Sequence, residues 1–230
     1  MSLRVMTYNI RGGKGMDDVR DLNRIAETVR GANADIVCFQ EVHQRFPGGD
    51  RADQPAELHR RLAGNVLFQR NINLVFGGYG IAIWSCAPFL KSAKHYLPSV
   101  GERRGVLVAE VTSSMGELAV LCTHWGLSDG ERMKQAEATA QIIAALRCPV
   151  IVAGDLNETY DKQAVQTLLK ASDLRDAASG SDTPTYPADN PQHRIDYLLY
   201  SSCFSAANVT VLDSLASDHR PLIAEFDVLK

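Results

Sequence analysis

The sequence predicts a layered α/β fold in which most strands are antiparallel. Short apolar runs of strand character recur at close spacing along the 230-residue chain, a pattern typical of antiparallel sheet. Between them lie longer stretches with apolar residues at helical spacing. Because no linker or low-complexity segment interrupts this pattern, we expect residues 1–230 to form a single domain.

The N-terminal region of the chain begins with a strand, a helix and a second strand. Residues 3–8 alternate like a strand, and residues 21–29 have helical periodicity before Gly31, which is a helix stop signal. Residues 35–40 form the next predicted strand. The following segment, 46–56, is polar and rich in Gly, Pro and Arg, and we expect it to be a loop near the mouth of the site.

The remaining chain alternates between strands and two further helices. Helices are predicted at 131–146 and 162–170, where amphipathic stretches occur. The predicted strands are 65–69, 72–76, 80–85, 89–97, 105–112, 117–123, 149–153, 195–200, 209–212 and 222–228.

Composition and charge limit the classes of function. The formal net charge is −3 and the basic residues are scattered, which argues against a protein that grips duplex DNA, although nucleic acid is not excluded. No apolar run approaches the roughly 20 residues of a membrane-spanning helix. The N-terminus lacks a secretory pattern, so we expect a cytoplasmic protein, unless a native leader has been trimmed. A monomer is the default expectation.

Five cysteines are present, without a close pair at metal-ligand spacing. We interpret them as reduced and mostly buried thiols. Cys122 lies two residues before His124, and residues two apart on a strand share a face. Cys122 is therefore the one thiol for which the sequence suggests a neighbouring base.

Several polar residues lie where predicted strands leave the core, and loops at such places commonly carry function. Asparagine, carboxylate and histidine side chains dominate this set. Its members are Asn9, Glu41, His124, Asp155, Asn157, Asp196, Asp218 and His219.

These residues lie in sequence blocks that resemble the endonuclease/exonuclease/phosphatase superfamily of deoxyribonuclease-like metal-dependent phosphoesterases. The Gly-Asp-x-Asn and Ser-Asp-His blocks are the most specific of them when they occur together in this order. The blocks are Thr7-Tyr8-Asn9-Ile10, Asp35-Ile36-Val37-Cys38-Phe39-Gln40-Glu41-Val42, Thr123-His124, Gly154-Asp155-Leu156-Asn157, Arg194-Ile195-Asp196-Tyr197 and Ser217-Asp218-His219-Arg220-Pro221. The resemblance covers nearly the whole chain and implies a four-layer sandwich of two mostly antiparallel β-sheets flanked by helices.

The resemblance also implies a metal site. Glu41, supported by Asn9 and Asp218, is expected to hold Mg²⁺ or Mn²⁺, which prefer hard oxygen ligands. Such an ion neutralises the phosphate while a water attacks it. Asp155 is the candidate that orients and deprotonates this water, and Asn157 is expected to hold the water or a phosphate oxygen.

Two histidines are expected to face the phosphate. His219 is expected to donate a charged hydrogen bond to it, with the Asp196 carboxylate behind the imidazole. His124 is the second phosphate-facing imidazole, which Glu102 or Trp125 could support.

Other positions concern the substrate groove. Ile81 and Cys86 replace the Asn and Arg that the family often has there, which puts the groove beside that strand in doubt. Arg104, Arg11 and Tyr186 are candidate substrate-binding residues, of which Arg104 lies in an Arg-Gly element and Tyr186 in a Thr-Tyr pair.

The leading functional hypothesis is a metal-dependent hydrolase of phosphoesters, with a phosphodiester in a small or flexible substrate favoured. A DNA endonuclease, acting at abasic sites or without specificity, is the alternative. A domain of the same fold that binds a partner without catalysis is a third hypothesis. A sphingomyelinase acting at membranes would need exposed apolar anchors, whereas Trp84 and Trp125 lie in contexts that predict burial.

Overall fold

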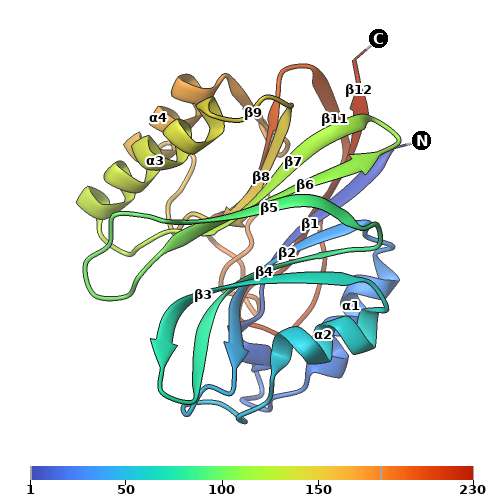
Figure 1. The fold of residues 1–230 in the computed structure, drawn as a ribbon, viewed down its shortest axis with the longest axis vertical. Helices are drawn as coiled ribbons and strands as arrows, with labels where there is room; N and C mark the ends of the chain where they lie inside the picture. The colour runs from blue at the N-terminus through green and yellow to red at the C-terminus, as the bar shows by residue number, and fades with distance from the viewer. Residues whose placement is uncertain (1, 182, 230) are drawn as a thin grey trace.

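The computed structural model describes residues 2–181 and 183–229, and within these ranges a pair of six-stranded sheets packs face to face (Figure 1). Two α-helices cover the outer face of each sheet. The structure therefore confirms the predicted four-layer sandwich. None of the helices in the described residues has both the length and the apolar character needed to cross a membrane.

The first sheet holds both ends of the chain. Its strand order is β11 (Phe204–Val211), β12 (Leu222–Val228), β1 (Leu3–Asn9), β2 (Ile36–Gln44), β4 (Gly77–Ser85) and β3 (Asn65–Leu74). Only the β1–β2 pair in this sheet is parallel, within the residues described.

The second sheet is built in the same way from the middle of the chain. Its strand order is β5 (Phe89–Tyr96), β6 (Gly105–Ser113), β7 (Gly116–His124), β8 (Val150–Asp155), β10 (Asp196–Ser201) and β9 (Leu174–Asp176). Here β7 and β8 are the parallel pair. Both sheets are thus mostly antiparallel, as predicted.

The helices cover the sheets because their apolar faces match the outward-facing strand residues. Helices α1 (Leu22–Gly31) and α2 (Gln54–Leu62) pack on the first sheet, whereas α3 (Asp129–Ala144) and α4 (Gln163–Ser172) pack on the second. A separate apolar core fills the space between the sheets. Most strands are therefore buried on both faces, which explains their near-continuous apolar runs.

The two parallel pairs determine where the site lies. Each pair needs a helical crossover, α1 in the first sheet and α3 in the second, and a crossover brings the carboxyl ends of both strands to the same sheet edge. Asn9, the last residue of β1, pairs with Gln40 in the middle of β2, next to Glu41, and His124 pairs with Asp155 at the ends of β7 and β8. Polar residues distant in sequence thus meet at one end of the sandwich.

Several segments differ from the prediction, among them the short strand β9, which was not expected. Helix α2 was not expected, although Asp53 accepts a hydrogen bond from the Ala56 N–H and Pro55 lies at the start of the helix, which are ordinary start signals. The predicted strands 65–69 and 72–76 are one strand, β3, with a register shift between Arg70 and Ile72. Strand β11 begins at Phe204, before the expected 209, because its exposed polar residues hide the strand pattern.

A glycine turn packs against a buried histidine before α1. Gly12 has φ 57°, and a Cβ at this position would lie 2.3 Å from Cε1 of His43. The ring of Phe46 covers another side of the imidazole, with 4.8 Å between ring centroids. Burial, with a smaller effect of Arg20, lowers the pKa of His43 to about 4.

We expect His43 to make the fold sensitive to mild acid. The unfolded chain protonates this imidazole below about pH 6.5, whereas the folded chain does so only near pH 4, so stability is full above pH 6.5 and is lost as the pH falls toward 4. The expected loss between pH 7 and pH 5 is about 1–2 kcal/mol. Urea unfolding of wild type and His43→Gln at both pH values measures it, and an equal loss in both proteins would contradict this expectation.

Candidate active site

A polar pocket of about 310 Å³ lies at the strand ends where the two parallel pairs meet. Most of the sequence-predicted residues line it, and Asn9, Asp196 and Arg11 contact those that do. The lining residues are Glu41, Tyr79, Glu102, Arg104, His124, Leu127, Asp155, Asn157, Tyr186, Ile195, Asp218 and His219.

Asn9 joins the two sheets through its side-chain amide. Its Nδ2 donates to Glu41 Oε1 at 3.2 Å and to Asp155 Oδ2 at 3.0 Å, while its Oδ1 accepts from the Arg11 N–H at 3.1 Å. Asn9 therefore holds the carboxylates of Glu41 and Asp155 in place. Its expected role as a metal ligand stays a prediction.

Glu41 owes its position to an irregularity in β2. The register with β4 shifts between Phe39 and Val42, and Glu41 at this shift has φ 58°. Burial, with a smaller effect from Asp218, raises the pKa of Glu41 although Asn9 opposes the change. Glu41 therefore carries charge that its surroundings do not fully compensate.

Asp218 has a cationic neighbour. Arg11 Nε lies 3.3 Å from Asp218 Oδ2, and about a third of the Arg11 side chain is exposed. Arg11 is therefore next to the site, where it neutralises some of the charge that Asp218 would offer to a metal ion.

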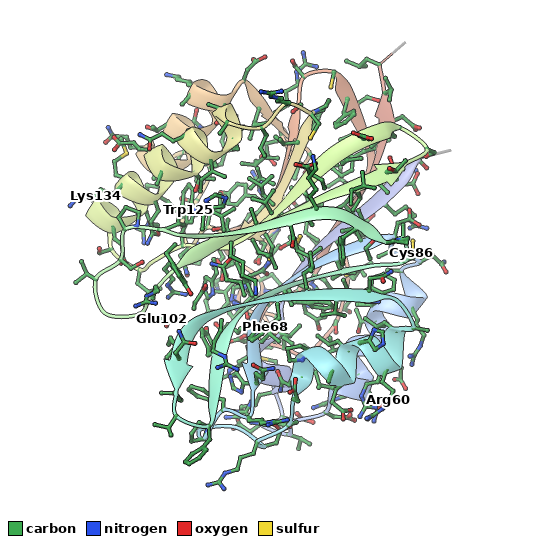
Figure 2. The ribbon with its side chains drawn as sticks, in the orientation of Figure 1. Arg60, Phe68, Cys86, Glu102, Trp125 and Lys134 are labelled. Carbon is green, nitrogen blue, oxygen red and sulfur yellow. The ribbon has the colours of Figure 1, made fainter. Side chains whose placement is uncertain are left out.

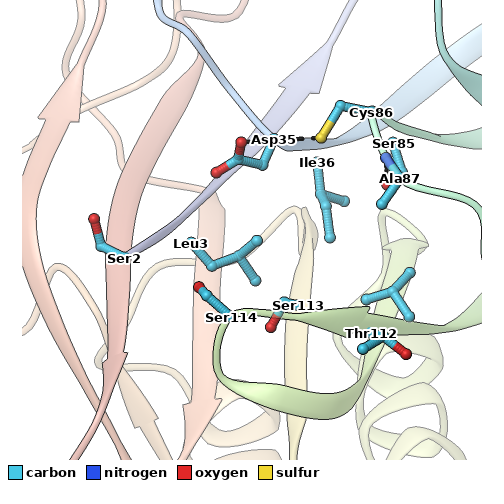
Figure 3. A pocket seen from close by; sticks show the side chains of 11 residues that line it. Ser2, Leu3, Asp35, Ile36, Ser85, Cys86, Ala87, Thr112, Ser113 and Ser114 are labelled. Carbon is cyan, nitrogen blue, oxygen red and sulfur yellow. Dashed lines mark hydrogen bonds between the residues drawn. The ribbon is translucent and has the colours of Figure 1, made fainter.

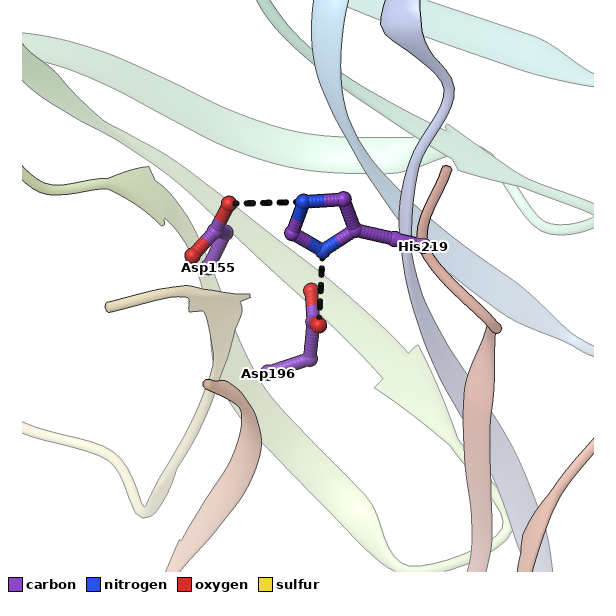
Figure 4. Close-up of side chains that lie close together, drawn as sticks. All are labelled: Asp155, Asp196 and His219. Carbon is purple, nitrogen blue, oxygen red and sulfur yellow. Dashed lines mark hydrogen bonds and ion pairs between the residues drawn. The ribbon is translucent and has the colours of Figure 1, made fainter. Parts of the chain in front are cut away.

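His219 lies between two buried carboxylates (Figure 4). Its Nδ1 is 2.9 Å from Asp196 Oδ2 and its Nε2 is 3.7 Å from Asp155 Oδ2. Asp155 and Asp196 are direct neighbours in the register of β8 and β10, which explains why both reach the same imidazole. Asp196 Oδ1 has no hydrogen-bond partner among the residues that the structure describes.

The charges in this cluster depend on one another. Burial raises the pKa of Asp155 to about 7, and Asp196 adds to this effect while His219 opposes it. Burial alone would lower the pKa of His219, but Asp196 and Asp155 outweigh it and raise the pKa to about 10. His219 is therefore a cation at neutral pH, and Asp155 is close to its titration point.

Asp155, Asp196 and His219 also lie close enough to one another to hold a metal ion. However, both imidazole nitrogens of His219 face carboxylates, and a protonated imidazole cannot be a ligand. We therefore interpret this cluster as an acid/base unit and Glu41 with Asp218 as the better oxygen set for a hard cation.

His124 is the second imidazole of the pocket. Its Nε2 lies 3.4 Å from Asp155 Oδ2, and burial, together with Arg104 and His219, lowers its pKa well below the usual value, so it is neutral. No hydrogen bond joins His124 to Glu102 or Trp125 in the described structure, so neither gives the support that the sequence suggested. Trp125 instead accepts a hydrogen bond from the Asn157 side chain.

Arg104 is a buried cation in the pocket wall, with 5% of its surface exposed. Its Nη1 lies 2.9 Å from Glu102 Oε1, an ion pair whose angles do not satisfy a hydrogen bond. The Nε group lacks a hydrogen-bond partner among the described residues, and the guanidinium lines the pocket, which suits this cation to an anionic ligand.

Four wall residues were not among the predicted site residues. Glu102 was considered only as a support for His124, and Tyr79, Leu127 and Ile195 were not considered. Tyr79 follows a Gly-Gly pair at the start of β4, and no sequence signal separates it from an ordinary strand residue. The predicted Tyr186 does line the pocket, with its ring centroid 4.8 Å from that of His219.

The two departures from the family pattern lie away from the pocket. Ile81 is buried in the core between the sheets, and Cys86 follows the end of β4 at the opposite end of the strands. Figure 2 shows Cys86 and Glu102 at opposite sides of the molecule. The two substitutions therefore leave the walls of this pocket unaltered.

The cysteines are free, as expected, but fewer are buried than predicted. Cys86 and Cys203 are exposed, since they lie in turns at strand ends, whereas Cys38 and Cys122 are fully buried. Cys122 points into the core between the sheets and contacts the Gln40 amide at 3.5 Å. The structure therefore does not support His124 as a base that deprotonates the Cys122 thiol. Both tryptophans are buried, as predicted.

A second cavity, of about 220 Å³, lies at the other end of the sandwich (Figure 3). Its walls come from the starts of β1 and β2 and from the segment after β4. Asp35 and Cys86 are its carboxylate and thiol, with 3.9 Å between Oδ1 and Sγ. Burial and the neighbouring Asp35 raise the pKa of Cys86, which makes this thiol less reactive.

The fold and the site together define a class of protein. The chain belongs to the Endonuclease/Exonuclease/phosphatase family, which matches residues 6–219. Members of this family are generally phosphoesterases or nucleases, are typically dependent on divalent metals and act on phosphate-containing substrates.

Individual relatives agree with this placement. The uncharacterized protein YbhP of Escherichia coli strain K12 is 30% identical over 244 residues, which cover 97% of this chain and 96% of that protein. The crystal structure of an endonuclease/exonuclease/phosphatase from Beutenbergia cavernae is 26% identical with a TM-score of 0.87, covering 99% of this chain and 72% of that chain. A mannosyl-6-phosphatase from Bacteroides thetaiotaomicron is 18% identical with a TM-score of 0.81, covering 98% and 99%, and this likeness concerns the fold alone.

Proposed function

We propose that this protein is a divalent-metal-dependent hydrolase of phosphoester bonds, with phosphodiesters in small or flexible substrates as its favoured targets. The observation that carries the proposal is the charged arrangement around Asp155. The Asp155 side chain, whose pKa is about 7, lies beside the cationic His219. Asn9 joins it to Glu41, which forms an acidic pair with Asp218. A general base is most effective when its pKa is near the working pH.

The acidic corner fits Mg²⁺ or Mn²⁺. Glu41 and Asp218 offer hard carboxylate oxygens, and the raised pKa of Glu41 indicates that its negative charge lacks compensation. A bound ion would supply neutralisation of the charge on the phosphate ester. Glu41 and Asp218 would hold it, and Asn9 would keep Glu41 in position.

The remaining residues would bind and orient the reactants. Asp155 is the base for the attacking water. The Asn157 backbone N–H donates to Asp155 Oδ1 at 2.9 Å and its side-chain nitrogen donates to the Trp125 carbonyl, so its side-chain oxygen is the group available to accept from that water. His219, which Asp196 keeps protonated, would donate to the phosphate as negative charge builds up in the transition state.

Two further groups would contact the phosphate from other directions. The guanidinium of Arg104, which lines the pocket, is suited to a phosphate oxygen, since it presents several donors in a fixed geometry. Neutral His124 can donate one hydrogen bond without adding charge to the pocket. Arg11 is close enough to move from Asp218 to an anionic substrate.

The preference for a small substrate follows from size and charge. A pocket of about 310 Å³ is at the lower end of the range for small-molecule sites. The chain carries a net charge of −3, whereas proteins that grip duplex DNA usually present a basic surface.

A hydrolysis panel tests the proposal. It contains a chromogenic phosphodiester, a phosphomonoester, abasic duplex DNA, single-stranded RNA, sphingomyelin and an inositol polyphosphate, each with Mg²⁺, with Mn²⁺ and with chelator. We expect metal-dependent cleavage of a small ester to be fastest. Faster nicking of abasic DNA than of any small ester would favour an endonuclease, and no cleavage despite bound metal would favour a non-catalytic binding domain.

We expect Glu41→Ala to weaken metal binding rather than to remove the base. Loss of one carboxylate ligand should lower Mn²⁺ affinity at least about tenfold, as disturbance of a metal's ligands typically does. Calorimetric titration with Mn²⁺ measures the affinity, and activity should partly return at high Mn²⁺. Glu110→Gln on β6, whose carboxylate pairs with Lys91 away from the pocket, is the control. Unchanged Mn²⁺ affinity in Glu41→Ala would show that the ion binds elsewhere.

A further inference from the structure

One side of the pocket wall plays no role in the chemistry proposed above. Its polar groups are Tyr79, on β4, and Glu102, in the loop before β6. Its apolar surface is formed by Leu127, Tyr186 and Ile195, which come from the segments after β7 and before β10. The substrate must therefore carry more than a phosphate, because these groups surround space that the phosphate does not explain.

Glu102 is the less expected of the polar groups. Its Oε1 lies 2.9 Å from Arg104 Nη1, and 35% of the side chain is exposed. Figure 2 shows this residue at the edge of the molecule. Glu102 thus keeps hydrogen-bonding capacity for a ligand while it is in contact with the cation that would bind the phosphate.

Tyr79 is held rigidly beside Glu102. Its ring packs against His43 and Phe46, with centroid distances of 5.6 Å and 5.9 Å, and it lines the same pocket as Glu102. Burial, with further effects of Glu41 and Glu102, raises the pKa of Tyr79 well above its usual value. The hydroxyl therefore stays protonated, so that it can donate one hydrogen bond to a ligand and accept another.

A carboxylate is an unfavourable neighbour for a bound phosphate. Burial raises the pKa of Glu102 and Glu41 adds to this effect, although Arg104 opposes it, and the substrate would bring further negative charge. An ionised carboxylate can only accept hydrogen bonds, so a ligand compensates it by offering a donor. In a phosphate ester the common donors of this kind are hydroxyl groups. Apolar side chains such as Leu127 and Tyr186 suit the C–H face of a hydroxylated ring.

We infer that Glu102 and Tyr79 bind a hydroxyl group of the substrate, and that the substrate is a phosphate ester of a cyclic polyol or sugar. Within the site, Glu102 would set specificity and would not act in bond cleavage. The inference rests on the proposed phosphoester hydrolysis, and it narrows the substrate class of that same pocket.

A pair of substrates that differ only in hydroxyl groups tests the inference. Inositol 1-phosphate and cyclohexyl phosphate have the same six-membered ring, and each is assayed as the monoester and as the methyl diester, with Mg²⁺ and with Mn²⁺. The variants are Glu102→Gln, Glu102→Ala and Tyr79→Phe, with Glu110→Gln as a matched surface control. Values of kcat/KM are measured for each ester, and Mn²⁺ affinity is measured by calorimetry.

We expect wild type to favour the hydroxylated ester by at least about tenfold, since sites built to bind a hydroxyl reject analogues that lack it. Glu102→Gln and Glu102→Ala should remove most of this preference, mainly through KM for the hydroxylated ester. Both should leave cleavage of the cyclohexyl ester and Mn²⁺ affinity within about threefold of wild type. Tyr79→Phe should have a smaller effect in the same direction.

Other outcomes overturn the inference in distinguishable ways. If the cyclohexyl ester is cleaved as well as the hydroxylated one by wild type, the inference fails while the proposed function stands. If Glu102→Gln lowers both rates equally, Glu102 merely positions Arg104. If it weakens Mn²⁺ binding as Glu41→Ala does, Glu102 belongs to the metal site. If neither ester is cleaved although the metal binds, both the inference and the proposed small-substrate hydrolysis fail.

Discussion

Replacement of Asp155 by alanine is expected to lower kcat by at least about a hundredfold, the usual effect of losing a positioned general base. This carboxylate is 1% exposed and contacts Asn9, His124 and His219. Its substitution removes the pocket carboxylate whose pKa burial raises to about 7. Steady-state kinetics on the best ester of the panel measure the effect.

A loss of fold must be separated from a loss of the base. Asp155→Asn keeps the shape of the side chain and should lose a similar factor in kcat, while thermal unfolding and Mn²⁺ affinity stay near wild type. Near-normal turnover in either variant would mean that another group deprotonates the water. A large drop in Mn²⁺ affinity in Asp155→Asn would instead place the carboxylate among the metal ligands.

His219→Ala is expected to reduce kcat/KM by at least about a hundredfold as well, because it removes a buried cation aimed at the phosphate. The larger share should fall on kcat, since charge on the phosphate grows toward the transition state. His59→Ala, which replaces an exposed imidazole on α2, is the matched control and should leave kcat unchanged.

The role of Asp196 in this unit gives a second test of His219. Asp196→Asn keeps the imidazole but removes the carboxylate that keeps it protonated, so the kcat of this variant should lie between wild type and His219→Ala. If Asp196→Asn has no effect on kcat at neutral pH, the positive charge of His219 does not depend on the Asp196 carboxylate. If His219→Ala retains normal kcat, the assigned role of this imidazole is wrong.

The sequence was most informative where the chain leaves a buried strand. Asn9, Glu41, His124 and Asp155 follow apolar runs, and the two parallel pairs bring these strand ends together. Asp196 could be placed beside Asp155 only through the pairing of β8 and β10, which no local pattern specifies. The resemblance to a known family supplied only the expectation that the Asp196 carboxylate lies behind the His219 imidazole.

Several residues that line the pocket could not be predicted from sequence patterns, for a physical reason. Tyr79 contacts the site from β4 and Leu127 from the segment after β7, and neither belongs to a local motif that marks a ligand. Glu102 was noticed, but its partner is Arg104, since the loop before β6 turns both side chains to the same pocket. Helix α2 was missed because its polar face resembles a loop, whereas its Leu58 and Leu62 bury against the first sheet.

The most direct test of the account is the metal dependence of ester cleavage by wild-type protein. Chelator-treated protein is assayed on the chromogenic phosphodiester and on inositol 1-phosphate while Mn²⁺ is added back. The account predicts no cleavage without metal and a saturable return of activity that follows Mn²⁺ binding measured on the same sample. Cleavage that persists in excess chelator, or no cleavage of either ester with Mn²⁺ bound at saturation, would contradict it.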